Sequence, residues 1–215
     1  FYANVVLEGL DGFKASSADG ASFNEIKGTA LFLRAFAFYQ ISQQFASPYQ
    51  LNTAKTDLGI PLRLSSDVNV VSKRSTLGET YERILLDLQS ALNLLPEKVA
   101  YKTRPNKVAC LAMLARVYLT MEDYANAGTY AQKALLLTKE LIDYNTLSAS
   151  DAFPLPAALP SGNVEALFYS VLNNLTTLSA ASTTTTIAPS LYNSYEADDL
   201  RRVILFTPRG AGQVF

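Results

Sequence analysis

The chain has 215 residues, of which 18 are basic and 19 acidic, so its formal net charge is −1. Because 49% of the residues are hydrophobic, much apolar surface must be buried within the chain or against a partner. The basic pairs at positions 73–74 and 201–202 are isolated, so no positively charged patch for nucleic acid is predicted, and we expect surface charges or local ion pairs there.

Histidine is absent from the sequence, and cysteine occurs once. This composition excludes Ser-His-Asp and Cys-His catalysis, and it excludes the common zinc sites within the chain. Cys110 lies in an apolar stretch and is predicted to be a small buried packing residue. No signal peptide, acylation motif or run of roughly 18 apolar residues is present. Since the chain begins at Phe1 without Met, we expect it to be incomplete at both ends.

The first half of the chain predicts two helices and a long insertion. Residues 1–10 are typical of the end of a helix, and residues 11–20 of a loop. A central helix is expected over 23–45, because this stretch is apolar on nearly all sides. Arg34 in its middle needs a carboxylate or carbonyl partner, since a lone buried guanidinium is costly. Residues 46–73 predict an ordered loop whose scattered apolar side chains pack on the helices.

Clear start and stop signals follow the insertion. Thr76 and Glu79 have the spacing of a capping box, and Pro96 ends the apolar helical period that follows. Residues 107–137 then match one tetratricopeptide unit, with Asn106 and Asp123 as helix caps around a tight turn. The best-matched positions, which we expect to be buried between helices, are Ala115, Tyr118, Ala127 and Ala134.

The final third is irregular. Residues 165–171 predict a short buried strand or extended segment, and residues 187–195 one or two helical turns beginning near Pro189. The predicted fold is mainly α: irregular tetratricopeptide-like helical hairpins with long loop insertions and little strand. We expect a single domain over 1–215, with a helical scaffold at 1–147 and a loop-rich part at 148–215.

No catalytic or cofactor motif stands out. The chain lacks a dinucleotide loop and a P-loop. Its adjacent acidic residues, at 122–123 and 198–199, are better explained by helix starts and by neighbouring arginines than by paired-carboxylate hydrolysis. We therefore expect a protein that is not an enzyme and needs no cofactor or metal, while a hydrolase with two carboxylates stays an alternative.

Taken together, the segments resemble the SusD/RagB family of surface nutrient-binding lipoproteins. The resemblance covers nearly the whole chain and is carried by the order and spacing of YANVVLEGLD (2–11), GTALFLRAFAFYQISQQFASPY (28–49), LGIPLRL (58–64), RSTLGETYERILLDLQSALNLLP (74–96), RPNKVACLAMLARVYLTMEDYANAGTYAQKALL (104–136), NVEALFYSV (163–171) and SLYNSYEADDLRR (190–202). Members are longer, begin with a signal peptide and a lipidated cysteine, and usually have glycine where this chain has Ala46.

This resemblance implies binding of a glycan or another nutrient at the cell surface, together with a SusC-like TonB-dependent transporter. It also implies location at the outer membrane, with attachment only through a lipid anchor outside this chain. Sugars are gripped by aromatic faces and polar side chains, and the chain has no tryptophan. Within the insertion we expect ligand contacts from Tyr49, Asn52 and Asp57. The alternative is a tetratricopeptide-type interaction scaffold that binds a partner peptide.

Overall fold

The computed structural model describes residues 1–13, 20–151, 154–156, 163–170, 186–206, 208–209 and 213–214. The chain divides into two compact units, which are described separately. The first unit spans residues 1–100 and 104–139, and the second spans residues 101–103 and 140–215.

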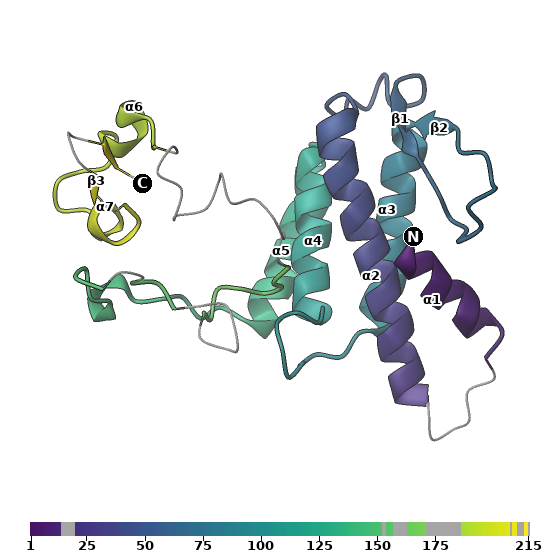
Figure 1. Ribbon diagram of the computed structural model, residues 1–215, viewed down its shortest axis with the longest axis horizontal. Coiled ribbons are helices and arrows are strands. Elements are labelled where there is room, and N and C mark those ends of the chain that lie inside the picture. The colour runs from purple at the N-terminus through teal and green to yellow at the C-terminus, as the bar shows by residue number, and fades with distance from the viewer. Residues whose placement is uncertain are drawn as a thin grey trace. The chain divides into compact units, whose positions relative to one another are not determined.

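The first unit is built from two helical hairpins. Its helices are α1 (Tyr2–Asp11), α2 (Gly20–Phe45), α3 (Leu77–Leu94), α4 (Lys107–Thr120) and α5 (Tyr124–Leu137). Helix α2 pairs with α3, α4 pairs with α5, and α3 packs on α4, so the hairpins lie side by side (Figure 1). Helix α1 packs against α2. The predicted mainly helical, tetratricopeptide-like architecture is confirmed.

The helices begin where their capping residues predict. The Thr76 hydroxyl accepts from the backbone N–H of Glu79 at 3.1 Å, and the Glu79 carboxylate accepts from the Thr76 N–H at 2.8 Å. Asn106 and Asp123 accept in the same way from backbone groups in the first turns of α4 and α5. These side chains satisfy backbone donors that a helix leaves without partners.

Arg34 of α2 makes the ion pair that its position requires. Its Nε and Nη2 donate to the two carboxylate oxygens of Asp87 on α3, at 2.7 and 2.8 Å. Its Nη1 donates to the side-chain oxygen of Asn4 on α1, at 3.1 Å. The Asp87 side chain is only 2% exposed, so this group joins three helices inside the unit.

Helix α2 is central, but its apolar residues divide between two faces. Phe32, Ala35 and Phe38 are buried against the neighbouring helices. The opposite face is exposed over much of its length and carries Ile26, Leu33, Ile41 and Phe45. We call these four residues the α2 stripe. Of the four small and aromatic residues expected between α4 and α5, Ala127 and Ala134 are buried, whereas Ala115 and Tyr118 are half-buried.

The insertion between α2 and α3 contains a short hairpin that the sequence did not predict. Strand β1 (Leu58–Pro61) pairs antiparallel with β2 (Arg74–Thr76), with an irregular register. Ile60 is 1% exposed and anchors the insertion in the core. Residues Val68 and Val71 are exposed, so the expectation that the whole insertion packs down holds only for its first part.

The second unit contains short elements: η1 (Tyr144–Thr146), α6 (Pro189–Tyr192), α7 (Leu200–Ile204), β3 (Pro208–Arg209) and β4 (Gln213–Val214), the two strands being antiparallel. The predicted turns near Pro189 are confirmed by α6. Asp199 caps α7 and forms an ion pair with Arg201 at 2.5 Å. Of the residues 165–171, predicted as a short buried strand or an extended segment, the described residues 165–170 form no strand and none of them is buried, so the buried strand is wrong there. The extended segment stays a prediction, and Val171 lies outside the described part.

Candidate functional site

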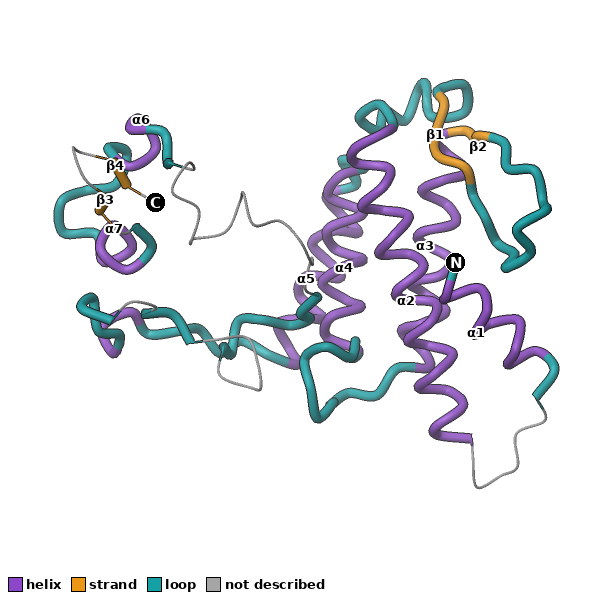
Figure 2. The backbone as a smooth tube through the Cα atoms, viewed as in Figure 1, coloured by secondary structure: helices purple, strands orange, loops and turns teal. Residues whose placement is uncertain are grey.

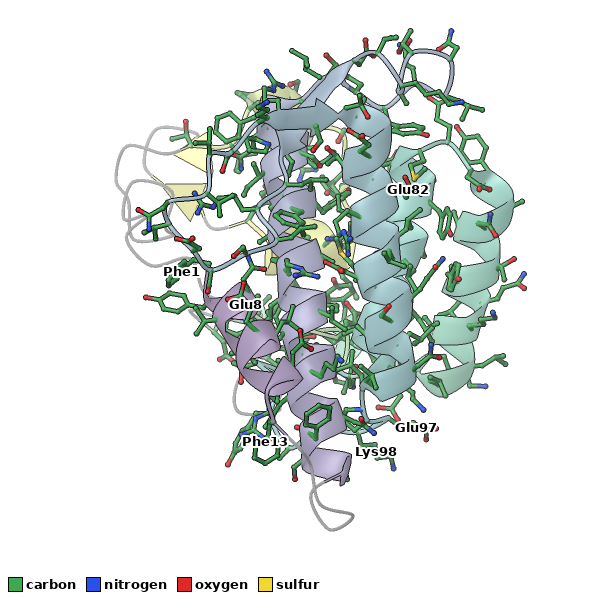
Figure 3. All side chains as sticks on the ribbon, turned by 90° about the vertical axis from the view of Figure 1, so that its right-hand side faces the viewer. Phe1, Glu8, Phe13, Glu82, Glu97 and Lys98 are labelled. Carbon is green, nitrogen blue, oxygen red and sulfur yellow. The ribbon has the colours of Figure 1, made fainter. Side chains whose placement is uncertain are left out.

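The insertion is fastened to α1 by two side chains one helical turn apart. The Asn4 amide donates to the carbonyl oxygens of Arg63 and Ser65, at 2.9 and 3.1 Å. Glu8 accepts from the Ser66 N–H at 2.9 Å and also from the Ser66 hydroxyl. Figure 3 shows Glu8 on α1 where the insertion passes beside the helix. Hydrogen bonds from the Ser66 hydroxyl, and then from its N–H, hold the pKa of the Glu8 carboxyl below its ordinary value.

Tyr49 packs the insertion onto α3. Its ring is 4.9 Å from the ring of Tyr81, at an interplanar angle of 59°. Tyr81 is buried, which raises the pKa of its hydroxyl, and Gln43 donates to that hydroxyl at 2.7 Å. The Tyr49 side chain is itself half-buried by this contact. Its position therefore has a sufficient explanation in packing.

Asn52 and Asp57 have different surroundings. Asn52 is exposed in a run of turns. Asp57 is half-buried, and its Oδ2 accepts from the Thr53 hydroxyl at 2.6 Å. Two hollows lie near the insertion, and Asp57 lines the larger of them. Tyr49 and Asn52 line neither hollow.

These hollows lie between the C-terminal end of α2 and the β1–β2 hairpin, which are adjacent in Figure 2. The first, here called the polar hollow, has a volume of about 780 Å³ and is lined by Gln44, Phe45, Ala46, Ser47, Thr56, Asp57, Leu58 and Arg74. The second, the apolar hollow, has a volume of about 370 Å³ and is lined by Ile41, Phe45, Gly59, Ile60, Pro61 and Arg74. Phe45 and Arg74 thus line both.

Arg74 is held by backbone carbonyl groups rather than by a carboxylate. Its Nε donates to the Gly59 oxygen at 2.8 Å, and its Nη2 donates to the oxygens of Leu58 and Phe45 at 3.1 and 3.2 Å. Within the described residues it has no ion pair, and it is exposed, so of the two alternatives predicted for the basic pairs Arg74 is a surface charge. Arg201 follows the other alternative, a local ion pair.

Phe45 and Arg74 were missed as site residues in the sequence. Phe45 occupies the end of a predicted apolar helix, where an aromatic residue is expected in the core, yet this residue is 70% exposed. Arg74 belongs to a basic pair, which the sequence alone suggests is surface charge. A usable signal would have been the position of both residues at the boundaries of the insertion, because loop boundaries often carry binding residues.

A third hollow lies between α1 and α2 and has a different character. It has a volume of about 470 Å³, and Tyr2, Val6, Ile26 and Leu33 line much of it. Its charged groups are Glu25 and Arg104, which pair with each other at 3.6 Å. This groove therefore offers an apolar surface and few polar partners for a ligand rich in hydroxyl groups.

The polar hollow suits binding better than hydrolysis. Asp57 is the one carboxylate among the residues that line the polar and apolar hollows, so a pair of carboxylates is not formed there. Elsewhere in the described part of the chain, no group of three His, Cys, Asp or Glu side chains could hold a metal ion. None of the described helices has both the length and the hydropathy of a membrane span.

Comparison with known proteins places this architecture in a family. The family model described as "Starch-binding associating with outer membrane" matches residues 1–119, more than half of the chain. The SusD-like protein P2 of Formosa agariphila is 32% identical over 114 residues, which cover 53% of this chain and 21% of that protein.

Solved structures give the same result. A SusD superfamily protein from Bacteroides thetaiotaomicron is similar with a TM-score of 0.61 and 28% identity, covering 66% of this chain and 32% of that one. A SusD-like carbohydrate binding protein from Bacteroides vulgatus has a TM-score of 0.58 and 25% identity, covering 68% and 31%. The chain thus spans about a third or less of the length of these relatives. With the family model matched over its first 119 residues, the chain belongs to the SusD-like family.

Proposed function

We propose that this chain forms the helical scaffold of a nutrient-binding protein at the outer-membrane surface, and that its nutrient is a glycan. The observation that carries the proposal is the match of residues 1–119 to a family described as starch-binding and associated with the outer membrane. The similar Bacteroides vulgatus structure, described as a carbohydrate binding protein, supports the same ligand class. In this role the protein captures its ligand without chemical change.

We further propose that the protein works with a SusC-like TonB-dependent transporter and is attached to the membrane by a lipid anchor outside these 215 residues. The scaffold favours this role because the packed helices of the first unit can hold binding loops and a partner surface in place. Among Tyr49, Asn52 and Asp57, which we keep as proposed ligand contacts, the geometry favours Asp57, because it lines a hollow.

Two measurements on the intact protein test this function. A tagged copy is purified in mild detergent from the outer membrane of its own cells, and we expect a TonB-dependent transporter to co-purify in stoichiometric amount. An unrelated outer-membrane lipoprotein carrying the same tag is the control. The purified protein is then run in native gels containing soluble starch or other polysaccharides, where we expect at least one to retard it. Absence of both the transporter and any retardation would overturn the proposal.

A further inference from the structure

We infer that the polar hollow at the C-terminal end of α2 is a binding subsite for a neutral sugar unit, with Phe45 as its stacking surface. Arg74 and Asp57 supply the hydrogen-bond donor and acceptor, and Gln44 adds an amide. The inference rests on the proposed function, since it names the place at which this part of the protein contacts its glycan.

Phe45 provides the apolar face that a sugar ring requires. It is the last residue of α2, it is 70% exposed, and it lines both the polar and the apolar hollow. Sugar rings present C–H groups on one face, and an aromatic ring that is already exposed gains by being covered. Ile41, which is 43% exposed, lines the adjoining apolar hollow, so the platform continues into a second apolar surface.

Arg74 provides a donor whose position is already fixed. Three carbonyl oxygens hold its Nε and Nη2 at 2.8 to 3.2 Å, and one of them belongs to Phe45. The guanidinium carries five N–H donors, so these contacts leave further donors for a ligand. Because the side chain is already ordered, a ligand that binds it loses little additional conformational freedom.

The charges of the hollow favour a neutral ligand. Arg74 contributes one positive charge and Asp57 one negative charge, and the two do not form an ion pair with each other. Gln44 and Ser47 line the same hollow and make no side-chain hydrogen bond with the described residues. Separate donors and acceptors beside an apolar platform match the hydroxyl groups of a neutral sugar, whereas an anionic ligand would meet the Asp57 carboxylate.

The size of the hollow is consistent with this ligand class. Its volume of about 780 Å³ lies within the range of small-molecule sites, roughly 300 to 1,000 Å³. The groove between α1 and α2 also falls in this range, but its lining is mainly apolar. The polar hollow is thus the better match to a hydroxyl-rich ligand.

The test compares variants of the intact protein in native gels containing soluble starch, glycogen, xylan or mixed-linkage β-glucan. An oligosaccharide of the best-retained polysaccharide is then titrated calorimetrically. Loss of one stacking contact weakens binding by roughly tenfold, so Phe45→Ala is expected to bind about that much more weakly. Gln44→Ala is expected to bind a few-fold more weakly. Both side chains are exposed, so both variants should keep the melting temperature of the parent.

Tyr124→Ala is the matched control. Tyr124 is 66% exposed, close to the exposure of Phe45, but it lies on α5 and does not line the hollow. Its replacement should leave affinity unchanged.

Three results would overturn the inference. If the parent protein binds a polysaccharide and Phe45→Ala and Gln44→Ala bind it equally well, the site is elsewhere and the proposed function stands. If only polyanions such as alginate or polygalacturonate are bound, the assignment of a neutral ligand is wrong while glycan binding stands. If no polysaccharide is bound at all, glycan binding fails, and this subsite fails with it.

Discussion

At the scale of single residues, the buried group formed by Arg34, Asp87 and Asn4 explains the one charge in the middle of α2. The sequence showed that Arg34 needs a partner, because an apolar helix cannot bury a guanidinium alone. It did not show which carboxylate, since Arg34 and Asp87 are 53 positions apart and meet only after α2 and α3 have paired. Long-range polar pairs of this kind depend on tertiary structure.

Replacing Asp87 by Asn should destabilise the protein strongly. The change leaves the Arg34 guanidinium, whose side chain is 11% exposed, without its charged partner. Breaking a buried pair from one side costs about 3 to 5 kcal/mol, to be measured as the free energy of unfolding in urea. Glu97→Gln is the control, since its pair with Lys107 at 3.9 Å is exposed and should contribute less than about 1 kcal/mol. Equal losses for both variants would contradict this account.

Gly59 is a second residue whose requirement is steric. A Cβ atom there would lie 2.1 Å from the Thr80 hydroxyl oxygen and 2.5 Å from the Thr76 carbonyl oxygen. We expect Gly59→Ala to destabilise by about 1 to 3 kcal/mol in thermal or urea unfolding, because the Thr76 backbone would have to move. Gly128→Ala on α5 meets no atom within 4 Å and should instead stabilise by about 0.5 to 1 kcal/mol. Gly59→Ala as stable as the parent would show that the insertion adapts freely.

At the scale of elements, the sequence predicted features that depend on neighbouring residues, such as helix starts. It did not predict features that depend on residues far apart in the chain. The caps at Thr76, Asn106 and Asp123 act within three residues, so the sequence alone located these helix starts. The β1–β2 hairpin joins residues 58–61 to 74–76 without an alternating pattern, and no local rule indicates it. The candidate hollow was missed for the same reason, since Phe45 and Arg74 come together only through this hairpin.

The contact between α1 and the insertion should depend on pH. The folded pKa of Glu8 lies below its ordinary value of 4.5, so the contact is complete above about pH 4.5 and is lost as the pH falls through the folded pKa. We expect the amide resonance of Ser66, which donates to Glu8, to shift in nuclear magnetic resonance spectra as the pH is lowered below about 4.5. Glu8→Gln should abolish the shift. A Ser66 amide unaffected by pH in the parent would disprove the contact.

At the scale of the whole molecule, the α2 stripe shows the limit of hydrophobic patterning. Helix α2 is apolar on nearly every side, so periodicity could not decide which side faces the core. The structure buries Phe32 and Phe38 and leaves Ile26, Leu33, Ile41 and Phe45 exposed on the described surface. Relatives about three times as long share this scaffold. Fold class and hairpin order therefore followed from sequence, whereas the outward face of the central helix did not.

The single cysteine allows opening of the first unit to be followed without an added probe. Cys110 is 0% exposed, its thiol donates to the Leu88 carbonyl oxygen across the α3–α4 interface at 3.1 Å, and burial raises its pKa to about 12. A thiol-specific maleimide should therefore react very slowly with the native protein and rapidly with the urea-unfolded protein. Fast labelling under native conditions would contradict this burial. If labelling is slow, its rate measures how often the two hairpins separate and expose Cys110. The native sequence thus already carries a probe for local opening.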